Sequence, residues 1–224
     1  MTITAAVATG AAASLVAVVH LVVALPRLTE PEDDPTDAFT KPSYASLARP
    51  RTYVAAALLG LLAGSLVPLA TPATRGLWFV LASAVAALVV IDGLTTYLPF
   101  ELTALSAGEL VAAGLVGSLL TGEWDWWLRA LGGAIAGWSL FWAVWRLGRG
   151  LGFGDVRLAA FIGLTAASLS WQVWWAALLM GSVVGAVVGL ITLVIRRWRP
   201  SPLGAAFAYG PALWVGPWVA LLLS

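Results

Sequence analysis

Apolar segments long enough to cross a lipid bilayer recur along almost the whole of this 224-residue chain. A membrane-spanning helix needs roughly 20 predominantly apolar residues. The hydropathy pattern predicts eight such spans, over residues 4–24, 52–70, 77–91, 102–120, 127–147, 156–169, 171–195 and 205–223. Only 10% of the residues are charged, whereas soluble domains carry about 25%. We therefore expect an all-α integral membrane protein, a polytopic bundle of about eight transmembrane helices.

The basic residues predict the orientation of this bundle. No positive charge precedes the first apolar segment, and Arg27 follows it, which is typical of an uncleaved span with its N-terminus outside. Ten basic residues then fall on the cytoplasmic side, and Arg75 and Arg129 fall outside, in agreement with the positive-inside rule. We expect a multi-pass protein of the inner (cytoplasmic) membrane. The ten are Arg27, Lys41, Arg49, Arg51, Arg146, Arg149, Arg157, Arg196, Arg197 and Arg199.

This interpretation divides the chain into three parts. Residues 1–25 form the first transmembrane helix, residues 26–51 a polar cytoplasmic loop, and residues 52–224 a seven-helix membrane core. The loop is rich in Pro, Asp and Glu and too short to bury a core, so we expect little fixed structure in it. Glycines spaced as in Gly181/Gly185/Gly189 indicate close helix packing within one bundle, with a dimer contact as the alternative; the sequence leaves the oligomeric state open.

Composition also limits the chemistry. The chain has no cysteine, which excludes disulfides, thiolate metal sites and a cysteine nucleophile. It has one histidine, which argues against a His-rich metal site. A net charge of +1 without a basic tail gives no indication of a nucleic-acid partner. We expect no metal and no cofactor.

Four acidic residues lie in or beside the cytoplasmic half of the predicted bundle: Asp92, Glu101, Glu109 and Asp155. Asp92 ends the third span and Asp155 begins the sixth, so both reach the same membrane face. An acid at such a depth indicates a functional site by default. The alternative is a plain helix-end acid, which for Asp155 the helix dipole would favour by roughly 0.3–1 kcal/mol. For Asp92, near a helix C-terminus, the dipole has the opposite effect.

Glu109 lies about 12 Å deeper than Glu101, at 1.5 Å per helical residue. A glutamate facing lipid there would be costly, so we expect it to face the bundle interior. It is interpreted either as a protonated structural hydrogen-bond partner or as a direct support of the reactive acids. His20, deep in the first span, is expected to be neutral and hydrogen-bonded.

Glycines precede Asp155 in the stretch GLGFGDVRL, residues 150–158. Gly152 and Gly154 give the backbone freedom and allow another chain to come close. This stretch resembles the GxGD-x-K-L signature of the type IV prepilin peptidases, which are membrane aspartic proteases. Asp92, followed by Leu98-Pro99, resembles the first aspartate motif of that family. FAYGP, at residues 207–211, resembles its Gly-Pro-containing terminal segment, and the resemblance covers most of the chain from about residue 49 onward.

The resemblance implies an endopeptidase that cleaves the short basic leader from a prepilin-like precursor at the cytoplasmic membrane face. Asp92 and Asp155 would activate water, and coupling between two carboxylates would leave one ionised and one protonated. The helix dipoles favour Asp155 as general base and Asp92 as general acid. Substrate-binding or supporting roles fall to Gly152, Gly154, Arg157, Pro99 and Glu109.

The chain also departs from the family pattern. Arg157 stands where the family usually has lysine, and Phe100 stands where asparagine commonly follows the proline. Many members carry, after the first span, a cysteine-rich, zinc-binding domain that is associated with methylation. The loop here has no cysteine, which implies a short form without methyltransferase activity.

Two alternatives remain open at this point. One is a proton- or cation-coupled transporter, with Asp92, Glu109 and Asp155 as a relay. The other is a peptidase-like assembly factor without activity.

Overall fold

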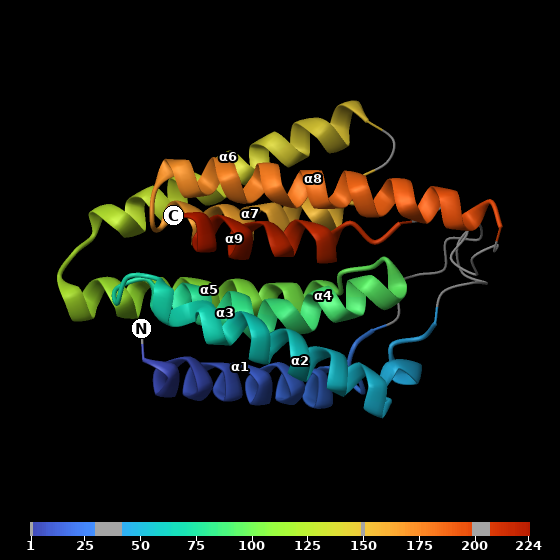
Figure 1. Cartoon of the computed structure of the whole chain (residues 1–224), viewed down its shortest axis with the longest axis horizontal. Coiled ribbons are helices and arrows are strands. Elements are labelled where there is room, and N and C mark those ends of the chain that lie inside the picture. Colours follow the sequence, from blue (N-terminus) through green and yellow to red (C-terminus); the bar gives the residue numbers. More distant parts are fainter. Residues whose placement is uncertain (1, 30–41, 149–150, 199–206) are drawn as a thin grey trace.

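The computed structural model describes residues 2–29, 42–148, 151–198 and 207–224, and all regular elements within these ranges are helices (Figure 1). The prediction of an all-α fold is therefore confirmed. The elements are α1 (Ile3–Ala24), η1 (Ala45–Leu47), α2 (Pro50–Leu66), η2 (Val67–Leu69), α3 (Arg75–Ala82), α4 (Ala84–Thr95), α5 (Phe100–Thr121), α6 (Asp125–Leu147), α7 (Phe153–Ala167), α8 (Trp171–Arg196) and α9 (Gly210–Leu223).

Each of the eight predicted spans corresponds to a helix or to a pair of consecutive helices. Five continuous segments are long and apolar enough to cross a membrane: Ile3–Ala24, Pro50–Leu69, Arg75–Thr95, Phe100–Thr121 and Trp171–Arg196. Of the last predicted span, 205–223, the first two residues lie outside the described ranges, and α9 begins at Gly210. The chain is accordingly a multi-pass membrane bundle.

The third span is broken in the middle. Helix α3 ends at Ala82, and Ser83 leaves the helical conformation with φ −113° and ψ −82° before α4 begins. The Ser83 hydroxyl donates to the Phe79 carbonyl at 2.7 Å, a contact that competes with the regular helical pattern. The break lies in the span that carries Asp92, and α3 and α4 still form one continuous segment, Arg75–Thr95.

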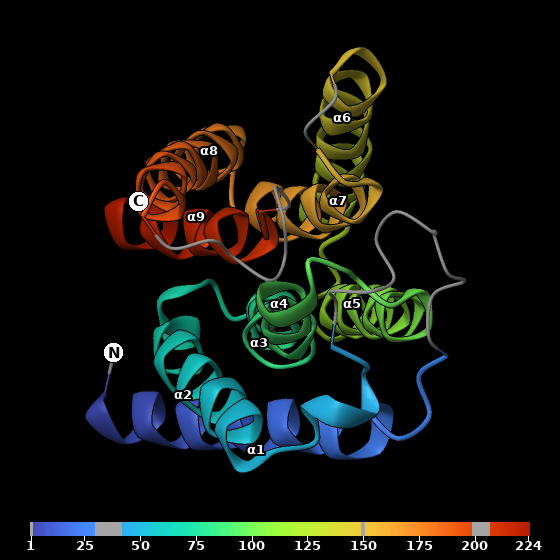
Figure 2. The same ribbon diagram turned by 90° about the vertical axis from the view of Figure 1, so that its right-hand side faces the viewer.

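The broken rod α3–α4 lies at the centre of the molecule, with α1, α2, α5, α7 and α9 around it (Figure 2). Within the apolar window of Arg75–Thr95, 78% of the residues are buried, against 17% for Trp171–Arg196 in α8. Helix α1 packs along α2, α6 along α7, and α8 along α9. Asp92 is thus carried by the most enclosed span of the bundle.

Small residues allow these helix pairs to approach closely. An ideal Cβ added to Gly163 of α7 would lie 2.3 Å from the Gly133 carbonyl oxygen of α6. The two helices are therefore in backbone contact at this point, which fixes α7 and the aspartate at its start.

Residues 30–41 of the predicted polar loop, 26–51, lie outside the described residues. At its described end, residues Ala45–Leu47 form the short helix η1, and Tyr44 and Leu47 are buried. This end of the segment is packed onto the bundle.

Candidate active site

Two helix ends meet at one end of the bundle. Asp92 lies in the last turn of α4, and Asp155 lies in the first turn of α7. Both line one cavity of about 160 Å³. The remaining lining residues come from the segment after α4 and from the start of α7: Thr96, Tyr97, Leu98, Gly152, Phe153, Gly154 and Arg157. Residues 63 positions apart in the sequence thus share one site, as the order of the spans allows.

Both carboxylates are buried, with 4% of Asp92 and 7% of Asp155 exposed. The Gly210 backbone N–H donates to Asp92 Oδ2 at 3.0 Å, and the Gly152 N–H donates to Asp155 Oδ2 at 3.1 Å. Burying two carboxyl groups in one cavity costs free energy that packing alone would not require. The arrangement therefore indicates a chemical role.

The segment that leaves α4 is conformationally strained. Thr96 has φ 59° and ψ 25°, a left-handed conformation that costs a β-branched residue about 1–3 kcal/mol. Its N–H donates to the Asp92 carbonyl oxygen at 2.6 Å, which turns the chain back across the cavity. The Thr96 hydroxyl is buried beside the cavity without a hydrogen-bond partner among the described residues. Such strain is typical of functional sites.

Pro99 shapes this segment from outside the cavity. It precedes α5, and its carbonyl oxygen accepts hydrogen bonds from the Thr103 N–H at 3.0 Å and the Thr103 hydroxyl at 2.7 Å. Pro99 does not line the cavity itself, whereas its neighbour Leu98 does.

The two glycines before Asp155 have different surroundings. An ideal Cβ on Gly154 would lie 2.9 Å from Leu98 Cδ1, whereas one on Gly152 would meet Asp155 Oδ2 at 3.4 Å, an ordinary contact. The space beside Gly154 is therefore filled by the chain's own Leu98. The space beside Gly152 opens toward the carboxylate.

Arg157 lies on the wall of the same cavity. Its guanidinium carbon is 5.3 Å from the centre of the Phe100 ring and 5.1 Å from that of Phe153. No ion pair joins it to an acid among the described residues. The aromatic rings hold the cation at the cavity without neutralising either aspartate.

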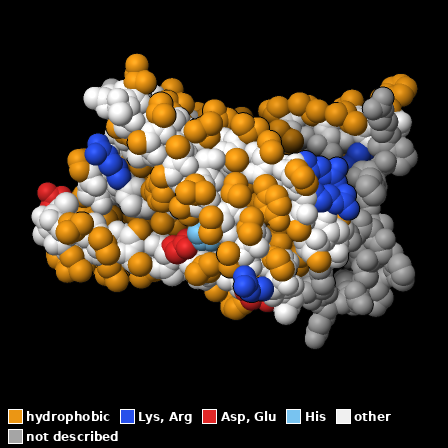
Figure 3. Space-filling model, turned by 90° about the horizontal axis from the view of Figure 1, so that it is seen from below, with side chains coloured by type: hydrophobic (Ala, Val, Ile, Leu, Met, Phe, Trp, Pro, Cys, Tyr) orange, Lys and Arg blue, Asp and Glu red, His pale blue; other side chains and the backbone are white. Residues whose placement is uncertain are grey.

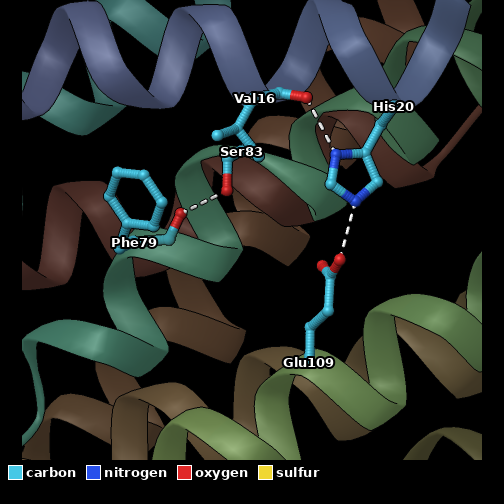
Figure 4. A network of polar contacts seen from close by, with 5 residues as sticks. All are labelled: Val16, His20, Phe79, Ser83 and Glu109. Carbon is cyan, nitrogen blue, oxygen red and sulfur yellow. Dashed lines mark hydrogen bonds and ion pairs between the residues drawn. The ribbon is translucent and has the colours of Figure 1, made fainter.

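Glu109 is not brought to this cavity. Its Oε1 lies 2.8 Å from His20 Nε2, and His20 Nδ1 lies 2.8 Å from the Val16 carbonyl oxygen (Figure 4). That carbonyl can only accept, so Nδ1 carries a proton, and one further proton lies between Nε2 and Oε1. The pair joins α1 to α5 as a neutral unit. It lies at the surface of the bundle, with hydrophobic side chains around it (Figure 3).

Two residues of the site were not predicted. Gly210 belongs to the FAYGP segment that resembles the family's terminal motif. The sequence therefore marked this segment but did not indicate what Gly210 does. Thr96 had no signal, because a β-branched residue is not expected in a left-handed conformation.

The sequence model of the type IV leader peptidase family matches residues 79–190, which contain both aspartates. The prepilin leader peptidase/N-methyltransferase of Aeromonas salmonicida (strain A449) is 36% identical over 141 residues, covering 61% of this chain and 45% of the relative. The protein of the same name from Stutzerimonas stutzeri is 37% identical over 99 residues, covering 42% of this chain and 32% of the relative.

The chain thus spans less than half of the length of the curated relatives it matches. No solved structure matches it. Since the family model covers half of the chain and includes both aspartates of the cavity, the chain belongs to the type IV leader peptidase family.

Proposed function

We propose that the protein is a membrane aspartic endopeptidase that cleaves the leader from prepilin-like precursors, with Asp92 and Asp155 as its catalytic pair. The observation that carries this proposal is the shared cavity, which two buried carboxylates line together with the glycines that precede Asp155. Membership of the leader peptidase family supports the same activity.

Peptide hydrolysis by two carboxylates needs one that takes a proton from water and one that protonates or hydrogen-bonds the scissile carbonyl. Asp155 begins α7, where the positive end of the helix dipole stabilises a negative charge, and Asp92 lies near the negative end of α4. Asp155 is therefore assigned as general base and Asp92 as general acid. A water between them would attack the carbonyl carbon while one proton passes from the water to Asp155 and Asp92 donates its proton to the carbonyl oxygen. The C–N bond would then break as Asp155 gives its proton to the leaving amine and Asp92 takes its proton back.

The substrate is a precursor with a short basic leader followed by an apolar helix. Its helix lies in the bilayer beside the bundle, with the leader junction at the cytoplasmic face of the inner membrane, where the cavity lies in the proposed orientation. The distribution of Lys and Arg, ten against two, supports this orientation, with the N-terminus outside.

The curated relatives carry the name of a second activity, N-methyltransferase. In this chain the polar segment 26–51 stands in place of the family's cysteine-rich domain, and the chain has no cysteine. The proposed activity is therefore that of a peptidase without the methyltransferase.

The test uses the full chain purified into lipid nanodiscs, with a prepilin-like precursor as substrate and mass spectrometry to identify the cleaved bond. Wild type is expected to remove the leader. Asp92→Asn and Asp155→Asn are each expected to lower the rate by at least about 10³-fold, as the loss of one member of a catalytic unit does.

Asp125→Asn is the matched control, because this acid begins α6 and does not line the cavity. It should cleave at the wild-type rate. Cleavage by either dyad variant at a near-normal rate would contradict the proposal. A wild type that cuts nothing but carries a proton or cation flux in liposomes would favour the transporter alternative.

A further inference from the structure

Asp92 is held in position by a helix from the opposite half of the molecule. The backbone N–H of Gly210, the first residue of α9, donates to Asp92 Oδ2 at 3.0 Å. The first N–H groups of a helix have no partner within the helix, so this donor is free to bind a side chain. Both groups are buried, which strengthens the bond relative to one in water.

Position 210 has no room for a side chain. An ideal Cβ on Gly210 would lie 2.5 Å from Asp92 Oδ2 and 3.1 Å from its Cγ. Gly210 does not adopt a positive φ angle, so the backbone conformation does not require a glycine. The close approach to the carboxylate does.

Helix α9 is itself tightly fixed. An ideal Cβ on Gly216 would lie 2.0 Å from the Ala177 carbonyl oxygen of α8, and one on Gly185 would lie 2.2 Å from the Tyr209 ring. The Trp214 indole N–H donates to the Leu81 carbonyl oxygen at 2.9 Å, in the last turn of α3. Packing against α8 and a hydrogen bond to α3 thus set the place of the Gly210 N–H.

The two carboxylates are held in the same way. Oδ2 of Asp155 accepts the Gly152 N–H at 3.1 Å, as Oδ2 of Asp92 accepts that of Gly210. The other oxygen of each carboxylate accepts no hydrogen bond from the described residues. Each aspartate therefore has one oxygen fixed by the backbone and a second one available at the cavity.

We propose that Gly210 is a positioning residue, which orients Asp92 toward Asp155 through its backbone N–H and through the absence of a side chain. This inference rests on the proposed function. It adds α9, which lies beyond the residues matched by the family model, to the catalytic apparatus. The helix that orients Asp92, α9, also packs against α7, which carries Asp155.

The experiment compares Gly210→Ala with wild type in the nanodisc cleavage assay. The added methyl group displaces the Asp92 carboxylate, and a displacement of about 1 Å typically costs about 100-fold in rate. We expect kcat to fall by about this factor while KM stays within about threefold, because the geometry of the reacting groups changes and not the substrate contacts. Gly189→Ala is the control, since its Cβ would meet Phe207 Cε1 at 3.9 Å, an ordinary contact near the same helix.

A Gly210→Ala protein that folds and retains kcat within about twofold of wild type would overturn the inference. If this variant does not fold, Trp214→Phe decides, because it removes the hydrogen bond from α9 to α3 and adds no atom beside Asp92. We expect it to lower kcat about threefold to tenfold without changing KM, because the Gly210 N–H beside Asp92 shifts when α9 loses its hydrogen bond to α3, and small displacements of reacting groups are costly. An unchanged kcat would also overturn the inference.

The failure of this inference is distinct from failure of the proposed function. If Asp92→Asn and Asp155→Asn are inactive while Gly210→Ala is fully active, the dyad stands and Gly210 has no positioning role. If the Asp→Asn variants cleave normally, the dyad itself is wrong.

Discussion

The guanidinium of Arg157 lies 5.3 Å from the centre of the Phe100 ring, so that a cation of α7 is joined to the start of α5 beside the cavity. Arg157 pairs with neither aspartate, and its role is therefore separable from that of the dyad. A stacked cation at a partly exposed site of this kind contributes about 0.5–1 kcal/mol to the contact between the two helices.

Arg157→Ala should raise KM about two- to fivefold, the equivalent of one lost ionic contact to the substrate of about 0.5–1 kcal/mol, and leave kcat nearly unchanged, because it removes a cation from the cavity wall that pairs with neither aspartate. Steady-state cleavage kinetics provide the measurement. Arg146→Ala, at an exposed position near the end of α6, is the control and should change neither constant. A loss confined to kcat would mean that Arg157 acts on the two carboxylates of the proposed dyad.

The His20–Glu109 pair shares one proton, so its stability should depend on a hydrogen bond and not on a net charge. Glu109→Gln should be tolerated, because the amide N–H can donate to a neutral His20 Nε2. Glu109→Ala should destabilise the protein by about 1–2 kcal/mol, as loss of an interhelical hydrogen bond in a membrane does. Unfolding in detergent is the measurement.

The double variant His20→Ala/Glu109→Ala should lose little more stability than the less stable single variant, because the effects of substituting two residues of one contact are not additive. Cleavage by Glu109→Gln should equal that of wild type. Loss of cleavage in this variant with intact stability would give Glu109 the direct role that its position outside the cavity argues against.

Gly152 and Gly154 should respond differently to the same substitution. Gly154→Ala places a methyl group 2.9 Å from Leu98 Cδ1, which pushes the start of α7 away from the segment after α4. We expect at least a tenfold loss of kcat, because small displacements of reacting groups are costly. Gly152→Ala makes only an ordinary contact with Asp155 Oδ2 and should lose less. The reverse order, measured in the cleavage assay, would contradict this assignment.

The contact of α6 with α7 should not tolerate larger side chains at its glycines. Gly163→Ala would bring a methyl group to 2.3 Å from the Gly133 carbonyl oxygen, and overpacking of this kind typically costs about 1–3 kcal/mol. Its unfolding midpoint in detergent should fall by several degrees. Gly132→Ala faces the Trp171 ring at 3.7 Å and should keep the wild-type midpoint. Equal midpoints for the two variants would show that this contact relaxes freely.

The sequence predicted the spans well, because hydropathy over about 20 residues is a strong signal in a bilayer. It did not predict the break at Ser83, since one serine in an apolar run is compatible with a continuous helix. The order of the spans predicted that Asp92 and Asp155 reach the same end of the bundle. That both line one cavity depends on how α9 packs against α4 and α7 and on how the segment after α4 meets the start of α7, which the sequence pattern does not specify.

The role of Gly210 depends on a contact between residues 118 positions apart. A Gly-Pro pair signals a helix start or a turn, but it does not identify the side chain that the free N–H meets. Glu109 shows the opposite limit. Its depth predicted that it faces the bundle interior, but its side chain is 31% exposed, and its partner is His20 of α1 and not the aspartates.

The enclosure of α3–α4 has a consequence for the lipids around the protein. Since this rod is covered by other helices along most of its length, membranes of different thickness act on it only indirectly. Thickness mismatch is accommodated by tilting of the helices that touch lipid, and the weakly buried α8 and α1 form that outer boundary. The position of Asp92 is thereby insulated from changes in acyl-chain length, and cleavage should depend little on the thickness of the bilayer.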